Sequence, residues 1–153
     1  MRHSRPEDFF NSMAAAYADG DFARVAEGFD TPGAVYVEDD IIVYNDTDSL
    51  IETLRSHCEA NFLLGTRRVS PKIVAQSLHG RQHFSVWVSW AHEDANGRPL
   101  FHVPMRYFFR RTPGGALSVQ LVELPDRPEA YESDKVRPPF RRTRERTGRR
   151  CVV

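Results

Sequence analysis

The chain has 153 residues, of which 41% are hydrophobic and 27% charged, and its Lys/Arg and Asp/Glu residues are equal in number. These values are typical of one globular domain that needs no disulfide support. No apolar run approaches the roughly 20 residues that a membrane helix needs, and the first residues lack a secretion signal. We therefore expect a cytoplasmic protein without a membrane partner.

The residue types that bind metals are scattered along the chain. Two cysteines and six histidines show no metal-ligand spacing. The glycines fall in turns rather than in a phosphate-binding loop. We therefore expect neither a metal nor another cofactor.

Charge is distributed unevenly between two parts of the chain. Residues 127–153 carry nine Lys/Arg and four Asp/Glu, whereas residues 1–126 carry 12 and 17. We interpret residues 1–126 as the domain and residues 127–153 as a basic, Arg- and Pro-rich extended arm. The arm either lies on the acidic body or on a partner subunit, or it attracts nucleic acid. Aromatic residues for base stacking are scarce in it, which makes nucleic acid the weaker alternative.

The first 33 residues predict two short helices. Pro6 suits the first turn of a helix, and Gly20 ends that helix. Asp21 can cap a second helix, which a turn at residues 31–33 ends. The apolar residues of each segment recur at helical spacing and form one face: Phe9, Phe10, Met13, Ala14 and Tyr17, then Phe22, Val25, Ala26 and Phe29.

A hairpin and a third helix follow. Residues 34–37 and 41–44 are rich in β-branched side chains and predict a short hairpin. Ser49 and Glu52 match a capping box at the start of an amphipathic helix that ends near residue 65.

Four longer strands are predicted from residue 69 onward, with glycine-containing turns between them. They span residues 69–78, 83–92, 100–111 and 116–124. Strands joined by such turns are antiparallel, and helices that precede a run of strands indicate the α+β class. We therefore predict three N-terminal helices packed in a curved antiparallel sheet.

Two of these strands carry large apolar side chains on both faces. Trp87 alternates with Trp90 in residues 83–92, and Phe108 alternates with Phe109 in residues 100–111. Helices can cover only one face of the sheet. We therefore expect the other face to contact a second subunit in a homodimer.

The order of these elements and several local strings resemble the nuclear transport factor 2-like superfamily, and within it the SnoaL-like and ketosteroid isomerase-like domains. The resemblance covers about residues 6–124 and rests on AYADGDFARVAEGF, AVYVEDD, HFSVWVSW and FHVPMRYFFRR. It implies a cone-shaped fold with an apolar pocket between sheet and helices, the usual form of a small-molecule site. The residues expected to line that pocket are Tyr17, Phe84, Val86, Val88, Trp90, His102 and Phe108.

This superfamily includes enzymes and noncatalytic modules, so the fold does not fix the function. The resemblance implies binding of a small apolar molecule, with acid–base isomerase, dehydratase or cyclase chemistry as one class. The rival class is a noncatalytic ligand-binding or assembly subunit, resembling the small β subunit of ring-hydroxylating oxygenases. The basic arm and an incomplete catalytic set favour that rival.

Ketosteroid isomerases place a carboxylate base at the end of the first strand, where Glu38 and Asp39 fall in this sequence. These acids are either that base or part of a solvated turn. The family's oxyanion-hole tyrosine and acid are matched here by Met13 and Arg106. The resemblance therefore does not imply ketosteroid isomerisation itself.

Arg106 is flanked by apolar residues on a central strand and needs a negative partner. That partner is either Glu38 or Asp39, in a structural ion pair, or an anionic group of the ligand, which a guanidinium binds with two hydrogen bonds. His57, near the inner face of the third helix, and His102 are candidate acid–base groups, with satisfied core histidines as the alternative.

Overall fold

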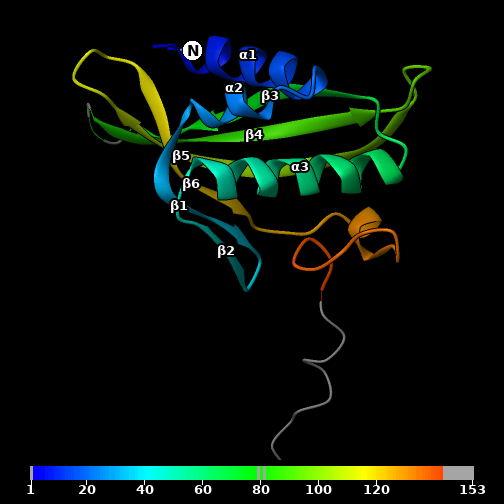
Figure 1. Cartoon of the computed structure of the whole chain (residues 1–153). Helices are drawn as coiled ribbons and strands as arrows, with labels where there is room; N and C mark the ends of the chain where they lie inside the picture. The colour runs from blue at the N-terminus through cyan, green and yellow to red at the C-terminus, as the bar shows by residue number, and fades with distance from the viewer. Residues whose placement is uncertain (1, 79, 81, 143–153) are drawn as a thin grey trace, which may run out of the picture.

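Three helices and one six-stranded curved sheet form the part of the chain that the structure describes, residues 2–78, 80 and 82–142 (Figure 1). In this computed structural model the helices are α1 (Pro6–Ala18), α2 (Phe22–Ala26) and α3 (Thr47–Leu63), and a 3₁₀ turn, η1, spans Glu129–Glu132. The strands are β1 (Phe29–Val37), β2 (Asp40–Tyr44), β3 (Arg68–Gln76), β4 (His83–Glu93), β5 (Pro99–Arg111) and β6 (Leu117–Leu124). The predicted α+β class is confirmed. No helix in these residues is long and apolar enough to span a membrane.

The strands follow the order β2-β1-β6-β5-β4-β3. Strands joined by a turn pair antiparallel, as predicted, but β1 and β6 pair in parallel. The sheet is therefore mixed, and the prediction of antiparallel pairing is wrong at this one pair. Turn residues specify the pairing of strands that follow each other, whereas β1 and β6 are far apart in the sequence.

Several element boundaries differ from those predicted, and two of them coincide with specific contacts. β1 begins at Phe29, which pairs with Val119 of β6, and the carboxylate of Asp30 accepts two hydrogen bonds of 2.9 Å from Arg110 of β5. At α3 the N-cap is Asp46: its carboxylate accepts from the backbone N–H of Ser49 at 2.8 Å, and the Ser49 hydroxyl accepts from the Asp46 N–H at 3.2 Å. The capping box therefore starts earlier than Ser49.

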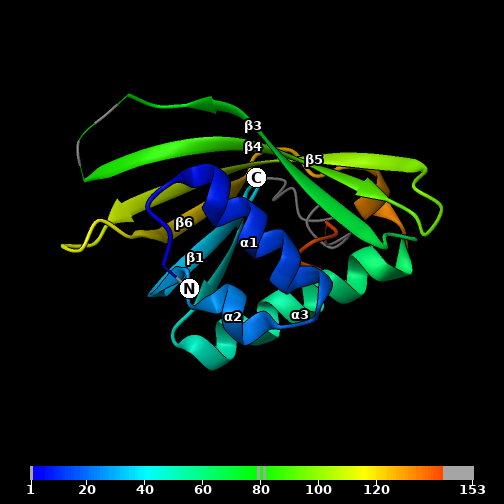
Figure 2. The ribbon, with the colours of Figure 1, turned by 90° about the horizontal axis from the view of Figure 1, so that it is seen from above.

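Helix α1 lies across the sheet (Figure 2), and aromatic side chains join its first half to the concave face. The ring of Phe10 lies 4.8 Å from that of Tyr107, and the ring of Phe9 lies 5.0 Å from that of Phe109, both edge-to-face. Phe84 stacks on Phe109 at 5.4 Å. Each buried ring contributes about 1.5–3 kcal/mol by leaving water. This cluster fills the space beneath the first half of α1.

The C-terminal segment folds back on the domain instead of extending from it. Tyr131 and Val136 are fully buried and Phe140 is 8% exposed. η1 lies beside the second half of α3 (Figure 1). Residues 127–142 are therefore part of the domain, and the predicted domain boundary at residue 126 is wrong. The rest of the predicted arm, residues 143–153, lies outside the described residues.

A buried arginine fixes this segment. Arg127 is only 3% exposed at its side chain and contacts the carboxylates of Glu38 and Asp40 at the β1–β2 turn. Its Nη1 donates to Glu38 at 2.9 Å, and its backbone N–H donates to the same carboxylate at 2.9 Å. It also donates to the backbone carbonyls of Pro139 (2.8 Å) and Phe140 (3.1 Å). One guanidinium thus joins the hairpin to both ends of the C-terminal segment.

Replacing this arginine tests its role. Arg127→Ala should lower the free energy of unfolding by about 3 kcal/mol, because it removes the hydrogen bonds that a buried guanidinium donates to two partly buried carboxylates and two backbone carbonyls. Urea unfolding measures the loss. The control is Arg68→Ala: the Arg68 side chain is 72% exposed and lies 3.8 Å from Glu93, so we expect a loss below about 1 kcal/mol. Equal losses for the two variants would contradict the assigned role of Arg127.

Candidate functional site

A cavity of about 90 Å³ lies between the concave face of the sheet and helices α1 and α3. Most of its lining is apolar, and the polar side chains that line it are Tyr17, Thr53, His57, Asn61, Trp90, His92 and Tyr107. Within the described ranges, no Asp, Glu, Lys or Arg lines the cavity. A charged group inside it would therefore meet no counter-charge from these residues.

His57 is the centre of a hydrogen-bonded cluster at the cavity wall. Its Nε2 lies 2.7 Å from the hydroxyl of Tyr131, and that hydroxyl donates to Oδ1 of Asn61 at 3.0 Å. Nδ2 of Asn61 also lies 3.3 Å from Nε2 of His57, so this ring nitrogen has a hydrogen-bond partner in either tautomer: Tyr131 can accept from it, and Asn61 can donate to it. Nδ1 of His57 lies 3.5 Å from the hydroxyl of Tyr17.

Tyr17 makes the longest hydrogen bonds in this cluster. Its hydroxyl lies 3.5 Å from Nδ1 of His57 and accepts from Nδ2 of Asn61 at 3.5 Å, both at the outer limit for such a bond. Burial, with the neighbouring Cys58, raises the pKa of Tyr17 well above its usual value, so the hydroxyl stays protonated. It is therefore available to donate to a carbonyl oxygen of a ligand.

Two imidazoles line the cavity, the partly buried His57 and the buried His92, and both are neutral near pH 7. Burial lowers the pKa of His57 to about 4. Burial, with smaller contributions from His57 and His102, lowers the pKa of His92 to about 3. The Nδ1 of His92 lies 3.1 Å from the hydroxyl of Thr66, and its ring stacks on Phe101 at 4.5 Å. The cavity thus offers neutral donors and acceptors rather than cations.

These residues do not suit a metal or a phosphate. His57 and His92 are the metal-binding residue types in the cavity lining. Across residues 2–78, 80 and 82–142, no three His, Cys, Asp or Glu side chains gather in a way that could hold a metal. A phosphate-bearing cofactor would find no lysine or arginine among the described residues of the lining.

Three of the residues predicted at the pocket line the cavity: Tyr17, His57 and Trp90. Tyr17 extends from α1, His57 from α3 and Trp90 from β4. The indole N–H of Trp90 donates to the hydroxyl of Tyr107 at 2.9 Å, which fixes both rings in the wall.

Phe84, Val86 and Val88 are buried, as expected for the concave face, but they do not line the cavity. Phe84 belongs to the aromatic cluster beneath the first half of α1. β4 therefore runs from a filled region of the core to the cavity, which it reaches at Trp90. The prediction that Phe84, Val86 and Val88 line the pocket is wrong because helix side chains occupy that part of the cone.

Arg106, His102 and Phe108 lie on the convex face of the sheet, so their predicted place in the pocket is wrong. Val103 and Met105 of the same strand line the cavity. Because side chains alternate along a strand, the residues at the intervening positions face the other way.

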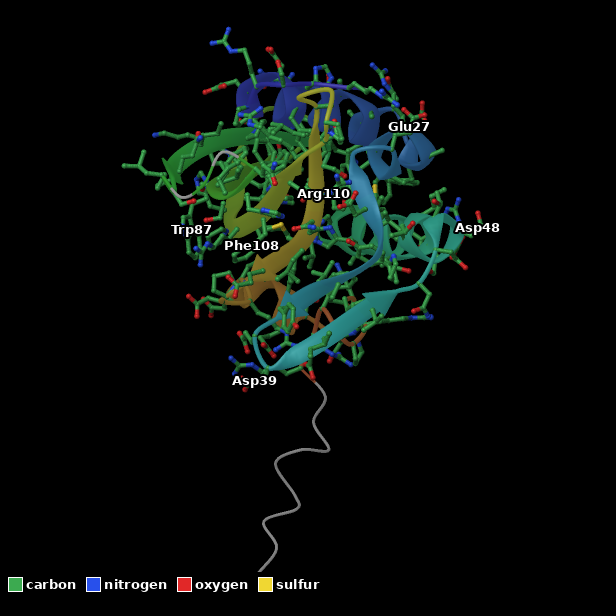
Figure 3. All side chains as sticks on the ribbon, turned by 90° about the vertical axis from the view of Figure 1, so that its left-hand side faces the viewer. Glu27, Asp39, Asp48, Trp87, Phe108 and Arg110 are labelled. Carbon is green, nitrogen blue, oxygen red and sulfur yellow. The ribbon has the colours of Figure 1, made fainter. Side chains whose placement is uncertain are left out.

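Arg106 has its partners on that convex face, among them Trp87 and Phe108, which Figure 3 labels. Its guanidinium lies 5.3 Å from the ring of Trp87 and 4.5 Å from that of Phe108, within cation–π range. Its Nη1 lies 3.9 Å from the carboxylate of Glu123. The negative partner is therefore neither Glu38 nor an anionic group of a ligand in the cavity.

Glu38 and Asp39 lie at the β1–β2 turn, outside the cavity lining. Figure 3 labels Asp39 at the tip of this hairpin. Burial alone would raise the pKa of Glu38, but Arg127 and Arg142 hold it below its usual value. Arg142 adds two hydrogen bonds of 2.9 and 3.0 Å to those of Arg127. Glu38 is thus a structural carboxylate. Asp39 is exposed, as the alternative of a solvated turn predicted.

Sequence reasoning missed Asn61, His92, Tyr131 and Phe140. Asn61 lies four residues after His57 on the same face of α3, and His92 lies two residues after Trp90 on the same face of β4, so both periodicities could have found them. Tyr131 and Phe140 lie in the segment interpreted as an arm, and no local pattern places them against His57.

The low pKa of His57 predicts how stability depends on pH. An unfolded histidine has a pKa near 6.5, above the value of about 4 in the folded protein. Between these values the unfolded chain binds a proton that the folded one does not, so stability falls as pH falls from about 6.5 to 4. Between pH 7.5 and 5, His57 should account for a loss of about 2 kcal/mol.

Urea unfolding at these two pH values measures this loss. His57→Gln should lose about 2 kcal/mol less than the parent protein over that interval. The control is Gln76→Ala, at an exposed position of β3, which removes no titrating group and should keep the parent dependence. An unchanged dependence in His57→Gln would show that His57 is not held neutral by burial.

The comparisons with known proteins concern the fold. No protein-family model and no curated protein matches this sequence. An NTF2-like protein with a cystatin-like fold from Novosphingobium aromaticivorans is similar in structure, with a TM-score of 0.60 and 15% identity over 80% of this chain and 81% of that one. A domain with a cystatin-like fold from Nostoc punctiforme gives a TM-score of 0.61 at 10% identity, over 76% of this chain and 71% of that one.

A ketosteroid isomerase-like protein from Erwinia carotovora atroseptica gives a TM-score of 0.55 at 14% identity, over 76% of this chain and 89% of that one. At such low identity, these similarities show a shared fold alone. The predicted resemblance is confirmed at that level: the chain has the NTF2-like, cystatin-like fold.

Proposed function

We propose that this protein binds an uncharged, mostly apolar small molecule whose polar group, such as a carbonyl, contacts the Tyr17–His57 cluster. One observation carries the proposal: an apolar cavity without charged lining residues in the described chain has a hydrogen-bonding cluster in its wall. Apolar walls with a few placed polar groups are the usual composition of a small-molecule site.

The absence of charge in the described lining selects the class of ligand. A buried carboxylate without a counter-charge costs several kcal/mol. The imidazole of His57 is neutral at pH 7, and the arginine that we expected to bind an anionic group, Arg106, lies on the convex face. A neutral ligand therefore fits this cavity better than an anion.

Acid–base chemistry is the second candidate, in the isomerase, dehydratase or cyclase classes. The neutral imidazole of His57 beside the Tyr17 hydroxyl favours it, with the imidazole as base and the hydroxyl as donor to a carbonyl. This arrangement would replace the carboxylate base expected at Glu38. However, a pKa of about 4 makes His57 a weak base at pH 7, so the geometry supports binding more strongly than rapid turnover.

The convex face supports a homodimer. The sheet register aligns Trp87, Arg106, Glu123, Tyr36 and Ile41 in one row across five strands. Tyr36 is 38% exposed and Ile41 55% exposed. A row with apolar ends and one charge of each sign is complementary to itself under a twofold axis, which fits a second copy of this chain.

The assembly-subunit alternative relied on a long basic arm that would wrap a neighbouring chain. Residues 127–142 instead pack on their own domain through Tyr131, Val136 and Phe140. This finding lowers the support for a wrapping arm as far as residue 142, and we favour ligand binding.

Calorimetric titration with acetophenone and benzoate tests the ligand class. The two probes share a ring, but only benzoate is charged at pH 7. Acetophenone should bind in about the millimolar range or tighter, and benzoate should not bind measurably. Tyr17→Phe should weaken acetophenone binding about fivefold by removing one hydrogen bond. The control Tyr36→Phe makes the same change on the convex face. Preference for benzoate would refute an uncharged ligand.

Light scattering at micromolar concentration tests the homodimer. The parent protein should have the mass of two chains. Ile41→Lys should shift it toward one chain, because a lysine in the row would be buried against apolar groups. Leu63→Lys, at a 53% exposed position on α3, should leave the mass unchanged. If the parent protein has the mass of one chain, the proposed homodimer is refuted.

A further inference from the structure

Phe140 is the residue of the described C-terminal segment that reaches the cavity lining. Its ring lies 4.8 Å from the ring of His57, with the two planes tilted by 33°, and it is 8% exposed. Every other residue of the lining comes from α1, α3 or the sheet. The wall of the cavity beside His57 is therefore supplied by a segment without regular structure after η1.

Different contacts hold the start and the end of this segment. Tyr131 and Val136 are fully buried, so residues 131–136 are part of the core. Beyond them, Arg127 donates to the backbone carbonyls of Pro139 at 2.8 Å and Phe140 at 3.1 Å, and Arg142 pairs with Glu38. Arg142 is 64% exposed, and an exposed pair contributes about 0–1 kcal/mol. Because Arg127 binds backbone carbonyls, the Phe140 ring can leave the cavity while these hydrogen bonds remain and Tyr131 and Val136 stay in the core.

The cavity is small for a ligand site while Phe140 is in place. Its volume of about 90 Å³ lies below the roughly 300–1,000 Å³ of sites for drug-sized ligands. Removing the Phe140 ring would add space directly over the imidazole of His57. A ligand ring in the place of the Phe140 ring would restore the apolar contacts that the cavity wall loses when Phe140 leaves.

We infer that the space filled by the Phe140 ring is a ligand subsite, occupied in the bound protein by an uncharged six-membered ring that displaces Phe140 and stacks on His57. This inference rests on the proposed function and narrows it from an apolar molecule to a ring compound. Phe140 is then a specificity-determining residue: its side chain and the ligand compete for one place.

Competition has a measurable consequence. Only molecules with Phe140 displaced can bind a ring. The apparent association constant is therefore the intrinsic one multiplied by the fraction of such molecules. Phe140→Ala removes the competitor and should tighten acetophenone binding about tenfold. Phe140→Leu keeps apolar cover with a smaller side chain and should have an intermediate affinity. This variant also serves if the alanine variant does not fold.

The fluorescence of Trp90 can report the exchange, because the chain has two tryptophans and the other, Trp87, lies on the convex face. All measurements use a Trp87→Phe background. Acrylamide, a neutral quencher, should quench Trp90 more strongly in Phe140→Ala than in the parent. Phe62→Ala, a matched change at a 56% exposed position on α3, should leave both quenching and acetophenone affinity unchanged.

The outcomes separate this inference from the proposed function. If the parent binds acetophenone and Phe140→Ala binds it equally or more weakly, Phe140 is a permanent part of the wall and the subsite is refuted, while the proposed function stands. If neither the parent nor the variant binds, both are refuted. Tighter binding together with stronger quenching of Trp90 supports the subsite.

Discussion

The guanidinium of Arg127 lies almost fully buried between the β1–β2 turn and the C-terminal segment. It is paired with two carboxylates and also donates to backbone carbonyls. These contacts offset the free energy that burying its charge costs. The contact sets the path of the chain after β6. That path brings Tyr131 to Asn61 and Phe140 to His57, so the composition of the cavity wall depends on an ion pair outside the cavity.

Other ion pairs of the sheet also lie outside the cavity. Asp30 is bound by Arg110, and Glu38 by Arg127 and Arg142, all away from the cavity lining. Because these carboxylates already have partners at hydrogen-bonding distance, none is available to meet a ligand inside the cone. The interior is left with neutral hydroxyls, an amide and imidazoles. This division limits the cavity to hydrogen bonding with uncharged groups.

The sequence was most informative where a contact is local. Helical spacing placed Tyr17 on the inner face of α1, and strand alternation placed Trp90 on the concave face of β4. The same alternation groups His102, Arg106 and Phe108 on one face of β5, but we expected that face to line the pocket, whereas Val103 and Met105 of the other face line it. Two features had no local signal: the parallel pairing of β1 with β6 and the contact between Glu38 and Arg127, which join distant parts of the chain.

The position of Phe140 also links the shape of the cavity to its chemistry. Burial is the cause of the low pKa of His57, and the Phe140 ring is part of that burial. If the Phe140 ring left without a replacement, water would reach the imidazole and its pKa would rise toward the usual value. A ligand ring that takes the place of Phe140 keeps water away. The exchange of one ring for another would therefore leave His57 neutral, with its Nδ1 beside the Tyr17 hydroxyl, in the empty and in the occupied protein.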